Sequence, residues 1–104
     1  MLNQVILVGR LTKEIKVLKS LESGKEYAII VIAIPRAFKN ENGEYETDFI
    51  RVQIWGSVAT NTAEYVRKGD LIGVKGRIQQ IGKQQLVVGE KITFLSSKKG
   101  EDNE

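Results

Sequence analysis

Residues 48–55 read Asp48-Phe49-Ile50-Arg51-Val52-Gln53-Ile54-Trp55, and the rest of the chain can be placed around them. Their alternating pattern predicts a β-strand, because successive side chains of a strand point to opposite faces of its sheet. One face carries aliphatic side chains suited to a core: Ile50, Val52 and Ile54. The other face carries two aromatic rings on either side of a guanidinium: Phe49, Arg51, Gln53 and Trp55.

This second face has two explanations. Aromatic rings and a cation on an exposed strand suit a nucleic acid, because unpaired bases stack on rings and arginine attracts phosphate. Alternatively, Phe49 and Trp55 pack beneath a loop, a helix or another subunit, as aromatic residues in small β-domains commonly do. The strand by itself leaves both explanations open.

Glycines, one proline and the hydrophobic pattern place the neighbouring elements. Asn42-Gly43 predicts a hairpin turn just before the Asp48 strand. After Trp55, apolar residues recur at helical spacing, with Ser57 as the expected N-cap and Gly69 as the expected residue after the helix. Four other stretches are predicted as strands: residues 4–11, continued around a bend by 14–18; residues 27–34, ended or placed at an edge by Pro35; residues 70–79; and residues 85–95.

The predicted order is therefore three strands, a helix and two strands. This order matches an all-β, five-stranded OB-fold barrel with one helix between strands 3 and 4, whose second and third strands commonly bind oligonucleotides. We expect this domain to cover residues 1–97 and the polar residues 98–104 to be disordered. Residues 27–34 are apolar on both faces, which suggests that another subunit shields part of that strand.

Composition narrows the possible functions. The 104 residues allow one domain, with a formal net charge of +3 that permits a polyanionic partner. The chain contains no cysteine and no histidine, so thiol nucleophiles, zinc knuckles and the commonest general base are absent. We therefore predict a protein without enzymatic activity, cofactor or metal. The sequence has neither a basic signal-like start nor an apolar run of about 20 residues, and a cytoplasmic location is expected.

Other residues extend the candidate binding surface. Phe38 lies at the end of the preceding strand, and Lys75 and Arg77 are expected to point outward from the fourth. Each has a simpler explanation, since surface lysine and arginine aid solubility and Phe38 can cap the hairpin. Together with the Asp48 strand they favour a surface for single-stranded nucleic acid, bound through stacking and charge. Stacking does not distinguish DNA from RNA.

Three blocks of sequence resemble the bacterial single-stranded DNA-binding proteins: residues 1–11, residues 48–56 and residues 63–69. The resemblance extends through Leu95 and implies a homo-oligomer, a tetramer or a dimer, that binds single-stranded DNA in replication, recombination or repair, near the nucleoid. It implies stacking by Phe38, Phe49 and Trp55 and phosphate contact by Arg51. The full set of predicted DNA-binding residues is Phe38, Lys39, Phe49, Arg51, Gln53, Trp55, Lys75, Arg77 and Arg10.

The sequence departs from this family's pattern in three places. The connection between the last two strands is short, around residues 81–84, where the family usually has a long hairpin with another stacking aromatic. Gln4 stands where a basic residue is frequent. The family's long tail with an acidic tip ending in Pro-Phe is not found, so the chain resembles a short form. The short connection and the missing tail favour a second hypothesis: an OB-fold accessory subunit that acts through contacts with a primase, polymerase or helicase. The retained Phe38, Phe49, Arg51 and Trp55 oppose it.

Overall fold

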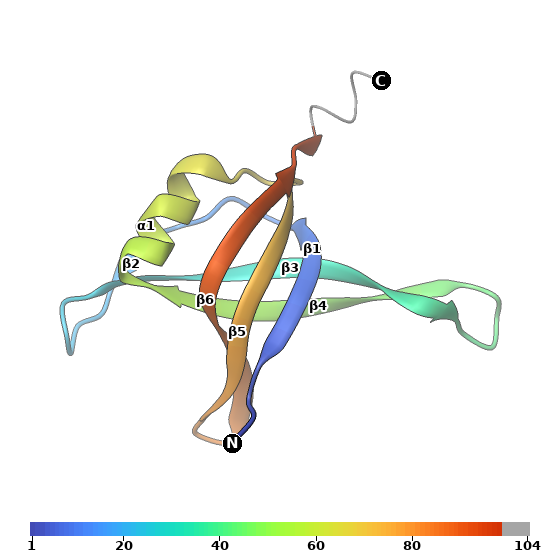
Figure 1. Cartoon of the computed structure of the whole chain (residues 1–104), viewed down its shortest axis with the longest axis horizontal. Helices are drawn as coiled ribbons and strands as arrows, with labels where there is room; N and C mark the ends of the chain where they lie inside the picture. The colour runs from blue at the N-terminus through green and yellow to red at the C-terminus, as the bar shows by residue number, and fades with distance from the viewer. Residues whose placement is uncertain (99–104) are drawn as a thin grey trace.

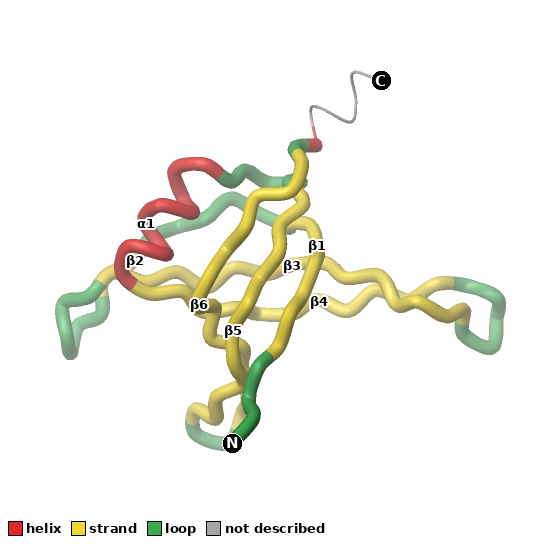
Figure 2. Tube along the Cα trace, viewed as in Figure 1, coloured by secondary structure: helices red, strands yellow, loops and turns green. Residues whose placement is uncertain are grey.

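Five long strands close into a barrel, and one helix packs against three of them (Figures 1 and 2). The structure is a computed structural model and describes residues 1–98. The predicted disorder of residues 98–104 therefore lies, except for Lys98, outside the described residues. The elements are β1 (Val5–Leu11), β2 (Leu18–Lys19), β3 (Glu26–Lys39), β4 (Tyr45–Trp55), α1 (Gly56–Tyr65), β5 (Leu71–Ile81) and β6 (Gln84–Ser96).

The strand order confirms the predicted OB-fold. The sheet runs β1-β5-β6-β4-β3-β2, and a further pairing of β1 with β3 closes it. Neighbouring strands are antiparallel except for β4 and β6, which pair in parallel at only two positions, Val52 with Val87 and Gln53 with Val88. The two-residue β2 adds only to the end of β3. Five strands thus form the barrel and the sixth is peripheral.

The barrel core consists of the inward side chains of the long strands. Val52 and Ile54 of β4 are completely buried, and Ile50 packs against them at the barrel edge. On β3, the alternate residues Ala28, Ile30 and Ile32 are buried in the same way. The predicted division of residues 48–55 into a core face and an outer face is therefore confirmed.

Several local predictions were wrong. Residues 14–17 do not continue the first strand; they form a loop that leads to β2, which pairs with β3. The helix begins at Gly56, with Trp55 rather than Ser57 at its N-cap and no side-chain capping hydrogen bond. Gly56 turns the chain from strand to helix with a φ of +58°, which glycine adopts readily. Gly69 belongs to the following turn, and the helix instead ends at a C-cap on Val66.

Strands β3 and β4 project beyond the barrel as a twisted two-stranded ribbon, seen at the right of Figure 1. We call residues 35–48 the arm. The predicted Asn42-Gly43 turn forms its tip, where Gly43 has a φ of +79° and Asn40 Oδ1 accepts hydrogen bonds from the backbone of Asn42 and Glu44. β3 continues through Pro35, where it pairs with β4 alone, so the missing proline N–H lies at a free edge.

Candidate nucleic-acid interface

The outer face of β4 presents the side chains expected of a binding surface. Phe49 is 65% exposed, Arg51 is exposed, and Gln53 and Trp55 are half-buried. Among residues 1–98, neither a loop nor the helix covers the Phe49 ring. The alternative that Phe49 packs inside its own chain is therefore wrong, while a role for a second subunit is not tested.

Strand β3 widens this surface. Its outward residues Tyr27, Ile29, Val31 and Ala33 lie opposite Trp55, Gln53, Arg51 and Phe49, respectively. The rings of Tyr27 and Trp55 are 5.0 Å apart at their centroids, with a 32° tilt. This contact fixes the orientation of the indole ring, since tilted aromatic pairs at such distances are favourable. We call the outward residues of β3 and β4 the platform.

Sequence reasoning did not include Tyr27 among the site residues. The signal was present, because Tyr27 begins the strand whose two faces are both apolar, and its outward position follows from the period of two. The register that pairs Tyr27 with Trp55 could not be derived from the sequence.

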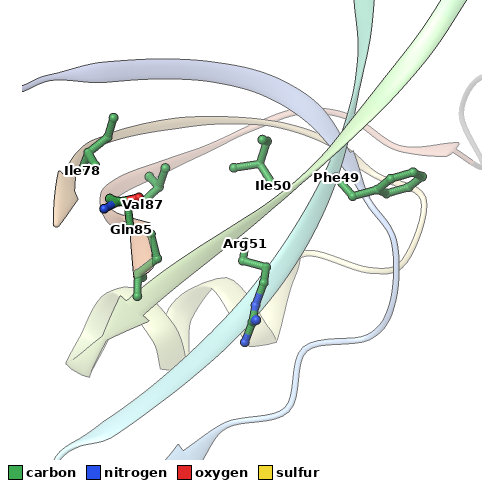
Figure 3. Close-up of a pocket in the computed structure, with 7 residues that line it drawn as sticks. Phe49, Ile50, Arg51, Ile78, Gln85 and Val87 are labelled. Atoms are coloured by element: carbon green, nitrogen blue, oxygen red, sulfur yellow. The ribbon is translucent and has the colours of Figure 1, made fainter. Parts of the chain in front are cut away.

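The hairpin between β5 and β6 borders the platform beside Arg51. A cavity of about 330 Å³ separates β4 from this hairpin and is lined by Phe49, Ile50, Arg51, Ile78 and residues 85–87. In Figure 3, Ile78, Gln85 and Val87 gather on one side, while the Arg51 guanidinium and the Phe49 ring point away from them. Arg51 also lines a smaller hollow of about 100 Å³ with Ile29 and Gln84. The positive charge of Arg51 therefore lies where the platform meets the β5–β6 hairpin.

The arm carries a separate group of aromatic and charged side chains. Phe38 is 85% exposed, and Lys39 Nζ lies 5.7 Å from the centroid of the Tyr45 ring. Arg36 contacts two carboxylates: its Nη2 lies 2.9 Å from Asp48 Oδ1 and its Nη1 lies 3.2 Å from Glu46 Oε1. The hydrogen bond from Arg36 lowers the pKa of the Asp48 carboxyl group below its ordinary value, and the same bond raises the pKa of Arg36.

The remaining predicted site residues lie further around the barrel. Arg10 of β1 shares a row with Ala33 and Phe49, and its Nη1 donates a hydrogen bond to the Gly69 carbonyl. Arg77 shares a row with Gln53 across β6, and it pairs with Glu90 at 2.9 Å. Lys75 lies opposite Ile6 and Lys91, on the strand separated from the platform by β1 and β6. The structure thus keeps Phe49, Arg51, Gln53 and Trp55 together but does not bring Lys75 to them.

Within residues 1–98, no group of three or more acidic side chains is placed to hold a metal ion. In the same part of the chain, no helix has the length and apolar character needed to span a membrane.

The sequence matches the model of the single-strand binding protein family over residues 2–96. This match covers the whole barrel. The chain belongs to the single-strand binding protein family. Membership confirms the resemblance seen in the sequence, and the family's shared fold is the barrel described above.

Individual members of the single-strand binding protein family show how far the likeness extends. Single-stranded DNA-binding protein 1 of Clostridium acetobutylicum is 39% identical over 107 residues, which cover 94% of this chain and 97% of that protein. The single-stranded DNA-binding protein of Bacillus cereus is 43% identical over 109 residues, but the chain spans only 64% of its length. The crystal structure of a deletion mutant of the Thermus aquaticus single-stranded DNA-binding protein aligns with a TM-score of 0.73 and 28% identity, over 93% of this chain and 52% of that one.

Proposed function

We propose that this protein binds single-stranded DNA without sequence preference, through base stacking and phosphate contacts, in replication, recombination or repair. The observation that carries the proposal is the platform, where exposed Phe49 and half-buried Trp55 flank Arg51 on a strand whose other face is the barrel core. Membership of the single-strand binding protein family and the names of the relatives support it. The proposal includes a location in the cytoplasm, at the nucleoid, which a single-stranded DNA ligand favours.

The spacing of the aromatic rings along β4 defines a path for the single strand of DNA. Phe49 and Trp55 are six residues apart, or roughly 20 Å at the rise of a β-strand. Phe38, which is 85% exposed on the arm, adds a third ring outside this line. Bases stack on the rings at about 1–3 kcal/mol each, whatever their identity, and Arg51 neutralises phosphate between them. This arrangement explains affinity without base-specific hydrogen bonds, and it calls for no catalytic group.

Trp55 is the only tryptophan in the chain, so its fluorescence tests the proposal directly. Titration with oligo-dT at low salt should quench the emission to saturation, and rising salt should weaken the binding because the release of counterions then gains less entropy. Double-stranded DNA of equal length serves as the control and should bind more weakly. The absence of both quenching and gel retardation with single strands would reject the proposal and leave the accessory-subunit hypothesis.

The proposal includes self-association into a homo-oligomer. Apolar side chains are exposed on the outer face of the barrel away from the platform: Ile6 is 69% exposed and Val8 49% exposed on β1, with Leu95 47% exposed on β6. Val8 of β1 pairs with Gly73 of β5. Gly73 in turn lies beside Leu95 of β6, since a Cβ added to Gly73 would be 3.8 Å from Leu95 Cδ1. The apolar surface is therefore continuous across these three strands. Patches of this kind mark interfaces. The tetramer expected from the family is one such assembly.

Light scattering tests this part separately from DNA binding. We expect a mass well above 11.7 kDa for the wild-type chain and a fall toward the monomer for Ile6→Glu. Lys25→Glu, which adds a negative charge at an exposed position in the turn before β3, away from this apolar surface, is the control. A monomeric wild-type protein would contradict the oligomer while leaving the platform unaffected.

A further inference from the structure

The arm contains a small hollow built from groups that bind anions and bases. It has a volume of about 230 Å³ and is lined by Arg36, Phe38, Lys39, Asn40 and Glu46. Phe38 supplies an exposed ring, Arg36 and Lys39 supply positive charge, and Asn40 supplies an amide. This is the set of groups that a nucleotide requires, a face for the base and donors for the phosphate.

The anion position of this hollow is already filled by the protein itself. Glu46 Oε1 lies 3.2 Å from Arg36 Nη1, and Glu46 Oε2 accepts a hydrogen bond of 3.2 Å from Asn40 Nδ2. The carboxylate is thus held at both oxygens by a guanidinium and an amide, beside the Phe38 ring. A phosphate oxygen accepts hydrogen bonds from the same donors at similar distances.

We propose that the Glu46 carboxylate is an internal competitor for a phosphate site, and that a DNA phosphate displaces it from Arg36 and Asn40 when a base stacks on Phe38. The inference rests on the proposed function, because it concerns one contact of the bound strand. It assigns Arg36 and Asn40 as phosphate ligands and Glu46 as the residue that limits their affinity.

The cost of this exchange is small. The side chains of Arg36 and Glu46 are 54% and 49% exposed, and ion pairs at such exposure are weak. Asp48 stays bound to the other edge of the guanidinium, with Arg36 Nε 3.1 Å from Asp48 Oδ2 and Nη2 2.9 Å from Asp48 Oδ1. Asp48 therefore holds Arg36 in place on the arm while the Nη1 edge changes its partner from carboxylate to phosphate.

The exchange also changes how the DNA-binding constant depends on salt concentration. In the wild-type protein, the displaced Glu46 carboxylate attracts cations from solution, which partly offsets the counterion released by the phosphate. With glutamine at this position no such offset exists. The slope of log K against log salt should then become steeper, by at most about 0.7, the value for one phosphate of a single strand.

The test compares oligo-dT binding by wild type, Glu46→Gln and Glu44→Gln, each alone and in an Arg36→Gln background. Glu44 lies on the same arm, and its side chain forms no ion pair in the described part of the chain, so Glu44→Gln removes the same charge without freeing Arg36. We expect Glu46→Gln to tighten binding by about two- to five-fold, more than Glu44→Gln, and this gain to vanish when Arg36 is glutamine.

The outcomes separate the inference from the function on which it rests. A gain from Glu46→Gln no larger than that from Glu44→Gln, or one that persists without Arg36, would overturn the displacement and leave Glu46 as a brace of the arm. Failure of the wild-type protein to bind oligo-dT would instead overturn the proposed function. Unfolding curves of all variants confirm that each retains its fold, since every substituted side chain is on the surface.

Discussion

The platform and the arm present similar side chains but are held in place by different forces. On the platform, Phe49 and Arg51 stand on a strand whose opposite side chains, Val52 and Ile54, are completely buried. On the arm, Phe38 stands on a two-stranded ribbon stabilised by hydrogen bonds of Asn40 and by the exposed ion pairs of Arg36. Burial of apolar surface contributes far more per side chain than exposed ion pairs do.

This difference indicates which parts of the binding surface are preformed. The barrel fixes the spacing of the platform rings, so their positions depend on the stability of the fold. The arm has no core beneath it and lies at the low-stability end of the structure, where local motion is least costly. Substitutions of the packed rings and of the core on the barrel should therefore affect stability and binding together, whereas substitutions on the arm should affect binding alone.

Ile54→Ala should have the largest effect, because it removes a completely buried side chain beneath the platform. We expect a loss of about 2–5 kcal/mol in the free energy of unfolding, measured by urea denaturation. Phe38→Ala on the arm is the comparison and should change stability by less than about 0.5 kcal/mol. Equal losses for the two variants would show that the arm is part of the cooperative core.

Removal of the stacking rings should have the next largest effect, and here on binding. Phe38→Ala and Trp55→Ala should each cost about 1–3 kcal/mol of binding free energy for oligo-dT, measured by gel retardation or anisotropy. Trp55→Ala should also reduce stability, because the ring packs against Tyr27 at 5.0 Å, whereas Phe38→Ala should not. Unchanged affinity in a folded Phe38→Ala variant would exclude the arm from the binding surface.

The sequence predicted the barrel well because its signals are local. The alternation of residues 48–55, the Asn42-Gly43 turn and the single helix each follow from side-chain period or backbone conformation. The course of residues 14–17 and the helix N-cap were missed, because β-branched residues at alternate positions also occur in loops and because Gly56, not a capping side chain, makes the bend from strand to helix. Such choices are decided by tertiary packing.

The site was predictable only in part, for a related reason. Residues on one strand share a face by sequence alone, so Phe49, Arg51, Gln53 and Trp55 were found together. Contacts between strands require the register, and this is why Tyr27 was missed and Lys75 was expected on a face that it does not share. The Arg36 ion pairs were missed for the same reason, since they join β3 to β4 across a register shift between Pro35 and Lys39.

Arg51→Gln should have a moderate effect that separates charge from stacking. Since Arg51 is exposed, stability should stay within about 0.5 kcal/mol of wild type. Affinity for oligo-dT should fall at low salt, and the slope of log K against log salt should become shallower by about 0.7, as expected for one lost phosphate contact. Lys75→Gln, on the far side of the barrel, is the control. An equal change of slope for Lys75→Gln would show that DNA follows a path beyond the platform.

The ionisation of Asp48 should have the smallest effect, and it tests the arm separately from the platform. Its folded pKa is lowered from the ordinary 3.8, first by the hydrogen bond from Arg36, which stays charged throughout. The carboxylate therefore stabilises the folded arm fully above this ordinary value, and the contribution is lost as the pH falls through the lowered pKa. Carboxyl-carbon NMR of Asp48 should show the titration in this acid range, and Arg36→Gln should return the pKa toward 3.8. A pKa that does not respond to Arg36→Gln would mean that this pair does not hold the arm in solution, and the contrast with the platform would then rest on the Asn40 hydrogen bonds alone.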